Sequence, residues 1–185
     1  MLIWSVQKMI TKLEAISFLK EHQPMPGDDE LTEYEIGKYE EVRNFFLNNV
    51  DAQCIPLFLN LFGGKDGLGV YQMVEDVILM YDKKEVLPHM LKAFNNPCKY
   101  VIYWCVQIAS NFPDKDLFTP LTAFMKHDDE DIQIASITTL AQLALNDIRS
   151  YEVIDVLKNE IEIASDEEVK EFIQEVLEDI LEDNK

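Results

Sequence analysis

The sequence predicts an all-α protein, folded as a right-handed superhelix of about four stacked helical pairs with an irregular N-terminal helical cap. The first observation behind this prediction is a recurring proline. Pro56, Pro88 and Pro120 stand 32 residues apart, each beside apolar residues at helical spacing. A helix tolerates proline near its first turn, where the missing N–H would have no partner. We therefore expect each proline to mark the start of a helix.

The second observation is a further helix predicted after each of these starts. Apolar or small residues recur there at positions i, i+4, i+7 and i+8, which is one face of an α-helix. The first residues of these faces are separated by 31, 31 and 37 residues. One such pair of helices cannot bury its apolar face alone, so the pairs must stack, as they do in α-solenoids. The predicted buried faces are Val70, Val74, Val77 and Ile78; Val101, Cys105, Ile108 and Ala109; Ile132, Ser136, Thr139 and Leu140; and Val169, Ile173, Val176 and Leu177.

The remaining elements follow from capping signals. Residues 1–50 do not share the repeat and are predicted to form the cap, with helices over about 6–22 and 32–49, the second opened by a Thr32–Glu35 capping box. Residues 51–185 are the predicted solenoid, and the two parts are expected to make one compact domain. A fourth first helix starts at Val153 with Asp155 in the proline position, and the final helix, 166–183, has Ser165 and Glu168 as its capping box.

The glycine-rich segment GGKDGLG, residues 63–69, is predicted to be a turn between the two helices of the first pair. It lacks the G-K-[ST] ending of a phosphate-binding loop. The alternative role for this segment is a contact loop for a partner.

The charge of the chain excludes two classes of ligand. There are 35 acidic and 16 basic residues, which gives a net charge of −19, and only Arg43 and Arg149 are arginines. Binding to nucleic acid or to an anionic membrane requires basic surface. We expect neither ligand.

The cysteines and the N-terminus indicate a cytoplasmic protein. Cys54, Cys98 and Cys105 are odd in number and form no C-x-x-C pair, which is typical of reduced thiols. The first residues, MLIWSVQKMI, lack the basic region and cleavage site of a signal peptide, and Lys8 and Lys12 interrupt them well short of a membrane-spanning length.

The sequence contains no recognisable catalytic or metal-binding motif. His22, His89 and His127 lack metal-ligand spacing, and no serine lies in a nucleophile motif. The DDED segment at 128–131 lacks the glycine of an EF-hand loop, and we interpret it as acidic residues at a helix start, where they favour the positive end of the helix dipole. The prediction is a protein without enzymatic activity, metal or cofactor.

The repeats resemble those of the HEAT-like family, in the short bacterial form known from phycobilisome lyases. Segments 127–144 (HDDEDIQIASITTLAQLA) and 164–180 (ASDEEVKEFIQEVLEDI) are the closest copies, and the resemblance covers roughly residues 51–183. It implies a right-handed α-solenoid, a fold that mostly binds other proteins. Some immunity proteins against nuclease toxins are built from such repeats. HEAT-like DNA glycosylases and bilin lyases are the enzymatic alternative.

Candidate binding residues lie on the second helices, on the side turned away from the predicted core. In the middle pairs this side is apolar for much of its length, which is typical either of a concave binding face or of packing against neighbouring helices. The positions concerned are Tyr103, Val106, Gln107, Ser110, Ile134, Ile137, Thr138 and Ala141. The predicted partner-binding residues are Gln72, Asp76, Tyr103, Gln107, Ile134, Thr138, Glu171, Glu175 and Glu178.

The last helix carries the acidic part of this surface. Its acidic residues recur every four positions, a spacing at which like charges repel. These residues are Glu167, Glu171, Glu175, Asp179 and Asp183. They form either a solvated cap or a docking face for a cationic partner. Together with the net charge, they predict a non-catalytic acidic scaffold that binds a basic protein, and neutralisation of a basic toxin is the specific hypothesis.

Overall fold

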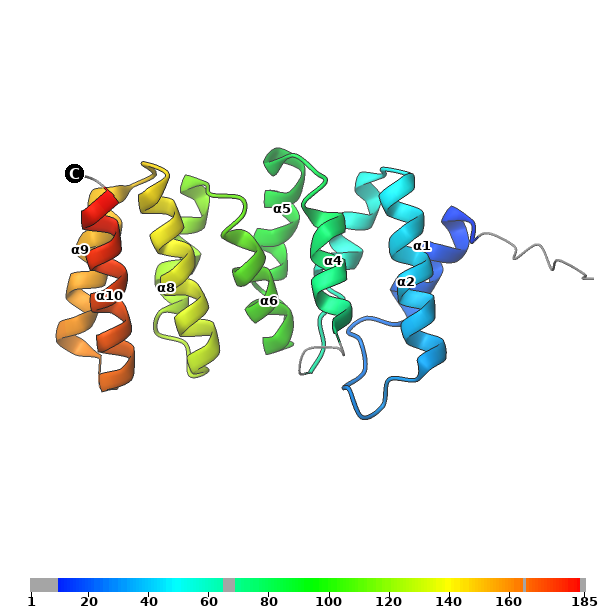
Figure 1. The fold of residues 1–185 in the computed structure, drawn as a ribbon, viewed down its shortest axis with the longest axis horizontal. Helices are drawn as coiled ribbons and strands as arrows, with labels where there is room; N and C mark the ends of the chain where they lie inside the picture. Colours follow the sequence, from blue (N-terminus) through cyan, green and yellow to red (C-terminus); the bar gives the residue numbers. More distant parts are fainter. Residues whose placement is uncertain (1–9, 65–68, 165, 184–185) are drawn as a thin grey trace, which may run out of the picture. The chain divides into compact units, whose positions relative to one another are not determined.

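The regular structure of the described residues is helical, which confirms the predicted all-α class. The computed structural model describes residues 10–64, 69–164 and 166–183, and in these ranges it contains α-helices and short 3-10 helices but no strand. The α-helices, shown in Figure 1, are α1 (Lys12–Glu21), α2 (Glu33–Asn48), α3 (Ile55–Leu59), α4 (Val70–Ile78), α5 (Lys83–Ala93), α6 (Lys99–Ala109), α7 (Phe118–Phe124), α8 (Glu130–Leu145), α9 (Ser150–Ile163) and α10 (Glu167–Asp183). None of the described helices is long and apolar enough to cross a membrane. The superhelical path of the helical pairs stays a prediction.

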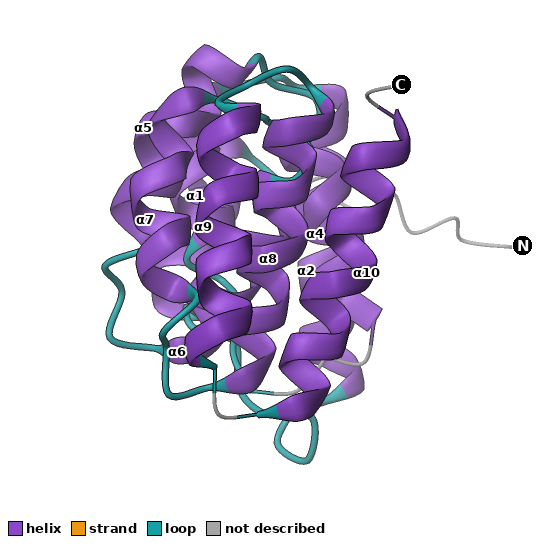
Figure 2. Ribbon diagram, turned by 90° about the vertical axis from the view of Figure 1, so that its left-hand side faces the viewer, coloured by secondary structure: helices purple, strands orange, loops and turns teal. Residues whose placement is uncertain are grey.

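The chain divides into two compact units, residues 1–86 and residues 87–185, and the division falls inside α5. In the first unit, α2 packs against α4 and α1 packs against α3. In the second unit, α8 is the central helix and contacts α6, α7, α9 and α10 (Figure 2). The predicted boundary between a cap and a solenoid at residue 50 stays a prediction.

Two threonines set the helix starts in the first unit. The predicted capping box is present: the Thr32 N–H donates to Glu35 Oε2 at 2.9 Å, and the Glu35 N–H donates to Thr32 Oγ1 at 3.2 Å. These bonds to Thr32 hold the pKa of Glu35 below its ordinary value. The helix α1 begins later than predicted, because Thr11 and Glu14 form an equivalent capping box that the prediction missed. Residues 6–9 of the predicted helix lie outside the described residues.

Two of the three repeating prolines mark helix starts as predicted. Pro56 lies in the first turn of α3, and Pro120 lies in the first turn of α7. A 3-10 turn leads into each of these helices, Ala52–Cys54 before α3 and Lys115–Leu117 before α7.

The prediction for Pro88 is wrong, because this proline lies inside α5. The helix begins at Lys83, since the segment before Pro88 continues as α-helix where the other two pairs form a 3-10 turn. Proline removes the N–H that would bond to the carbonyl four residues earlier, here that of Lys84. Pro88 and Lys84 are both exposed, so water can satisfy this carbonyl and the helix tolerates an interior proline.

The predicted buried faces of α4, α6, α8 and α10 are confirmed. All sixteen residues assigned to these faces are buried, and none is more than 9% exposed. Burying a large apolar side chain contributes roughly 1.5–3 kcal/mol, so these faces contribute strongly to the stability of each unit. The two polar members are hydrogen-bonded: Ser136 Oγ donates to the Gln133 carbonyl at 2.7 Å, and Thr139 Oγ1 lies 2.9 Å from the carbonyl oxygens of Ala135 in α8 and of Val106 in α6, which share its one proton.

The glycine-rich segment lies between α3 and α4, as predicted, and its first glycine, Gly63, is buried. A Cβ atom on Gly63 would lie 1.9 Å from the carbonyl oxygen of Met25. The Gly63 N–H donates to the Tyr71 hydroxyl at 2.6 Å, and the Met25 N–H donates to the Leu61 carbonyl at 2.7 Å. Close packing of the 23–30 turn therefore requires glycine at residue 63. The loop residues 65–68 lie outside the described residues.

The final helix matches its prediction to within one residue at its start. In α10, the Glu168 N–H donates to the Asp166 carboxylate at 2.8 Å. The predicted capping residue Ser165 lies outside the described residues.

Two of the cysteines are core residues, as the sequence predicts. Cys54 and Cys105 are fully buried and Cys98 is half-buried. Burial raises the pKa of the Cys54 thiol to about 11 and also raises that of Cys105. Such thiols are poor nucleophiles and act as small apolar side chains.

Candidate functional site

Four of the nine predicted binding residues line one groove in the second unit. The groove lies between α6 and α8 and has a volume of about 260 Å³. Equivalent positions on these two second helices are therefore brought together, as the repeat spacing predicts. The lining residues are Tyr103 and Gln107 from α6, and Glu130, Asp131, Ile134, Ala135 and Thr138 from α8.

The wall of the groove combines an aromatic ring and an aliphatic side chain with hydrogen-bonding groups. Gln107 Nε2 donates to the Tyr103 hydroxyl at 2.6 Å, and Tyr103 packs edge-to-face on Trp104 with ring centroids 5.5 Å apart. Tyr103 and Ile134 are half-buried, whereas Gln107 and Thr138 are exposed. Partly exposed side chains of this kind are the usual anchors of a protein interface.

The predicted apolar strip is narrower than expected. Val106 and Ile137 are fully buried and Ala141 is 8% exposed, so these three residues belong to the core. The reason is that α6 and α8 pack directly against each other, so the neighbouring helix covers the residues along one edge of the predicted strip. Ser110 is half-buried, and its hydroxyl donates to the Gln107 carbonyl at 2.6 Å. Packing therefore accounts for part of the apolar character, as the alternative interpretation expected.

Two carboxylates that were not predicted to belong to the site line the groove. Glu130 and Asp131 occupy the first turn of α8 and are exposed, so the interpretation of the DDED segment as a helix start is confirmed. The adjacent carboxylate, Asp129, accepts a 2.6 Å hydrogen bond from Lys99 at the start of α6, which lowers its pKa. The sequence signal for the two groove acids is their spacing of four and three residues from Ile134, which puts them on one side of the helix.

The predicted residues of the first unit are placed differently. The Asp76 carboxylate forms an ion pair with Arg43 at 2.5 Å, so its charge is paired with a residue of its own unit. The Gln72 side chain lies outside the described residues.

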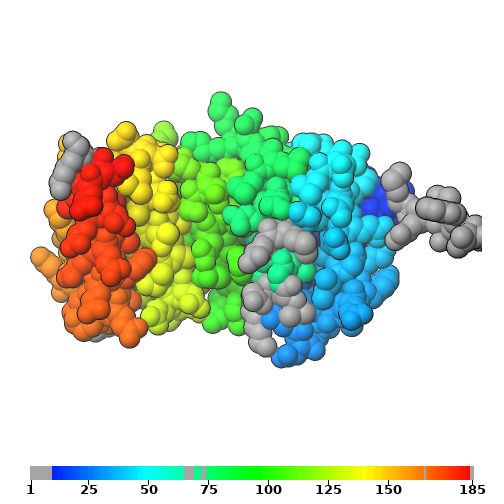
Figure 3. Space-filling model, viewed as in Figure 1, coloured from blue at the N-terminus to red at the C-terminus, as the bar shows by residue number. Residues whose placement is uncertain are grey.

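The predicted acids of α10 are exposed and lie on a helix that packs against α8. Figure 3 shows the red and orange surface of α10 beside the yellow surface of α8. Glu171 and Glu175 occupy the repeat positions that Ile134 and Thr138 occupy on α8. The predicted binding acids that are exposed on α10 are Glu171, Glu175 and Glu178.

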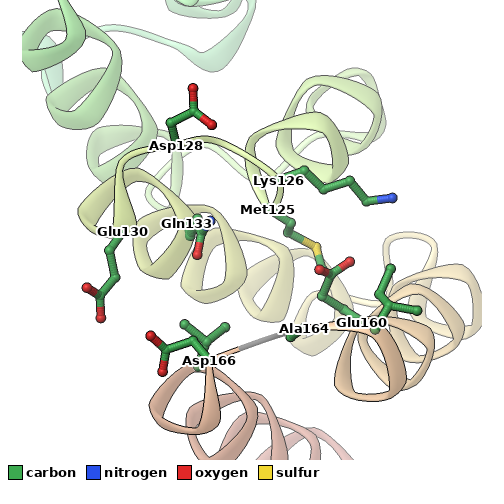
Figure 4. Close-up of a pocket in the computed structure, with 10 residues that line it drawn as sticks. Met125, Lys126, Asp128, Glu130, Gln133, Glu160, Ala164 and Asp166 are labelled. Carbon is green, nitrogen blue, oxygen red and sulfur yellow. The ribbon is translucent and has the colours of Figure 1, made fainter.

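A second pocket, of about 400 Å³, was not predicted from the sequence. It lies among the end of α7, the start of α8, the C-terminal part of α9 and the start of α10 (Figure 4). Among the residues that the structure describes, its lining contains one basic residue, Lys126, and four carboxylates, those of Asp128, Glu130, Glu160 and Asp166.

Comparison of the chain with protein-family models and with curated protein sequences finds no match. The likeness to HEAT-like repeats therefore depends on segments 127–144 and 164–180 themselves. Within the described ranges, no group of three or more His, Cys, Asp or Glu side chains is placed to hold a metal ion. The groove and the pocket offer apolar, hydrogen-bonding and anionic surface.

Proposed function

We propose that this protein is a non-catalytic acidic scaffold that binds a basic protein through the groove between α6 and α8. The observation that carries the proposal is the composition of that groove. Half-buried Tyr103 and Ile134 supply apolar contact, and exposed Glu130 and Asp131 supply negative charge beside them. Protein interfaces commonly combine a few such anchors with complementary charge around them.

The net charge of the chain supports the choice of a basic partner. A charge of −19 attracts cationic proteins over distances comparable with the Debye length and speeds their association. The exposed acids Glu171, Glu175 and Glu178 extend the negative surface on α10, next to α8. The apolar anchors then determine how long the complex lasts, since short-range packing mainly sets the dissociation rate.

A narrower form of the proposal is that the partner is a nucleic-acid-binding toxin and that this chain neutralises it. Its support is the charge complementarity with proteins that bind nucleic acid, together with the resemblance to repeats found in some immunity proteins. In this form the acids of α10 cover the partner's phosphate-binding surface, while the groove holds the centre of the interface.

The experiment that tests the proposal measures binding of the protein encoded by the neighbouring gene, by isothermal titration calorimetry. We expect a complex whose affinity falls steeply as the salt rises from about 0.05 M to about 0.5 M. No salt-sensitive complex, together with no protection of cells that express the neighbouring protein, would refute the toxin form. Release of a nucleobase or transfer of a bilin by the purified chain would instead favour the enzymatic alternative of the HEAT-like glycosylase or bilin-lyase type.

A further inference from the structure

Glu160 places a carboxylate where the repeat otherwise has an apolar core residue. Counting from the proline position, Leu61, Ala93 and Met125 occupy this place in the first three pairs, and all three are buried. In the fourth pair the residue is Glu160, which is also buried, with 9% of its surface exposed.

The Glu160 carboxylate has no partner among the described residues. No hydrogen bond or ion pair joins it to a side chain or N–H of the described ranges, although Lys126 lines the same pocket. The side chain is mostly buried, but its carboxylate oxygens are not among the buried polar atoms without a partner, so they are open to the pocket. Figure 4 shows this side chain pointing into the second pocket, beside the thioether of Met125.

The rest of the pocket suits a long cationic side chain. Asp128, Glu130 and Asp166 add three carboxylates to that of Glu160, against the single ammonium group of Lys126. The lining therefore carries more negative than positive charge, which attracts a cationic side chain.

The walls supply the other contacts that such a side chain needs. Gln133 Nε2 donates to the His127 carbonyl at 2.5 Å, which directs the amide oxygen of Gln133 to act as an acceptor. Met125, Ile163 and Val169 line the pocket with apolar atoms, which can contact an aliphatic stem.

We propose that this pocket receives an arginine side chain of the basic partner, with the guanidinium group at Glu160. Arginine fits better than lysine because its planar group offers five donors to acceptors in different directions, and because it is less strongly hydrated. The inference rests on the proposed binding function and adds a second contact site to the α6–α8 groove.

The test uses the full ¹⁵N-labelled chain and a blocked tripeptide, acetyl-Gly-Arg-Gly-amide, followed by NMR. We expect saturable shifts of the amides of Gln133, Ala164 and Val169. The same peptide with citrulline in place of arginine keeps the shape but loses the charge, and it should cause no such shifts. Equal shifts with the citrulline peptide would overturn the proposal. The same peptide with lysine in place of arginine should bind more weakly, and tighter binding of that peptide than of the arginine peptide would also overturn it.

Matched variants separate the pocket from general attraction to an acidic protein. Glu160→Gln and Asp166→Asn should each weaken peptide binding by about tenfold, because each removes a carboxylate from the pocket. Glu182→Gln removes the same charge from an exposed position in the last turn of α10 and should change binding by less than about twofold. Equal weakening by Glu182→Gln, or unchanged binding by both pocket variants, would overturn the assignment.

The peptide experiment can fail without refuting the proposed function of the groove, and the two failures can be told apart. The peptide experiment needs no partner protein, and Asp166 is exposed, so its substitution does not disturb the core. A neighbouring protein that binds the wild-type chain and Glu160→Gln equally well would refute the arginine pocket alone. Free arginine that binds about tenfold more tightly than the blocked peptide would overturn the assignment to a partner's side chain.

Discussion

The hydroxyl oxygen of Thr139 on α8 lies 2.9 Å from the carbonyl oxygen of Val106 on α6 and 2.9 Å from that of Ala135 on its own helix, so its proton is shared between the two acceptors. Both residues are buried, with exposures of 1% and 0%. The carbonyls that follow Val106 accept bonds from the turn after α6, with donors at Ser110, Asn111 and Phe112. Thr139 therefore satisfies a carbonyl at the helix end from the neighbouring helix, and it joins the two walls of the groove.

Thr139→Val should destabilise the protein by about 1–3 kcal/mol, because it preserves the shape of the side chain but leaves the buried Val106 carbonyl without its donor. Urea denaturation at constant m-value measures the loss, and Thr139→Ser should recover most of it. Thr138→Val is the matched control: the Thr138 hydroxyl bonds only to a carbonyl of its own helix and is exposed, so the change should stay within about 0.5 kcal/mol. Equal effects at the two positions would contradict the role of Thr139.

Two glycines should respond to alanine in opposite directions. Gly63→Ala should destabilise strongly, because its Cβ would lie 1.9 Å from the Met25 carbonyl oxygen. Gly37→Ala, inside α2, meets nothing within 4 Å and should stabilise by about 0.5–1 kcal/mol through helix propensity. Thermal unfolding of the two variants checks both signs. A neutral Gly63→Ala would show that residue 63 does not pack against Met25.

The repeat made the buried faces predictable, because apolar residues return on one helical face after 31, 31 and 37 positions, and such a face marks the core. The start of α5 was not predictable from Pro88, since the same proline position follows a 3-10 turn in two pairs and lies inside a continuous helix in the third. The local sequence does not show which of these two backbones the packing selects.

The candidate site was predictable only in part. Helical spacing correctly brought Tyr103 and Ile134 to one groove, but it could not show that Val106 and Ile137 are covered, because a helical wheel contains no neighbouring helix. The pocket was missed although its signal was present: Glu160 is the one charged residue in the repeat position otherwise held by leucine, alanine and methionine.

Glu160→Met should raise the free energy of unfolding by about 1 kcal/mol, because methionine is the residue of the third pair at this core position and adds buried apolar surface there. Glu162→Met, on the exposed face of the same helix, should have almost no effect on stability. Chemical denaturation of both variants measures the difference. A destabilised Glu160→Met would show that the carboxylate has a structural role.

The Lys99–Asp129 pair predicts a pH-dependent contribution to stability. The hydrogen bond from Lys99 lowers the pKa of Asp129, so the stabilisation is present above the unfolded carboxyl pKa of about 3.9 and is lost as the pH falls through the lower folded value. The same bond raises the pKa of Lys99, so the stabilisation is lost again as the pH rises through that raised value.

Lys99→Met should therefore be less stable than the wild type at pH 7, and the two proteins should converge in strong acid. Urea denaturation across this range measures the difference. A stability difference that does not change with pH would show that the methionine alters packing rather than the ion pair.

The most direct test of the binding account compares Ile134→Asp with Tyr151→Asp against the neighbouring basic protein. Both variants add one negative charge to the second unit, but Ile134 lines the groove, whereas Tyr151 is 89% exposed on α9. If apolar contact in the groove carries the complex, Ile134→Asp weakens binding by about tenfold or more, even though its charge favours a cationic partner, and Tyr151→Asp changes it by less than about twofold. Circular dichroism confirms that both variants are folded. Wild-type affinity for a folded Ile134→Asp protein would contradict the assignment of the groove as the partner-binding surface.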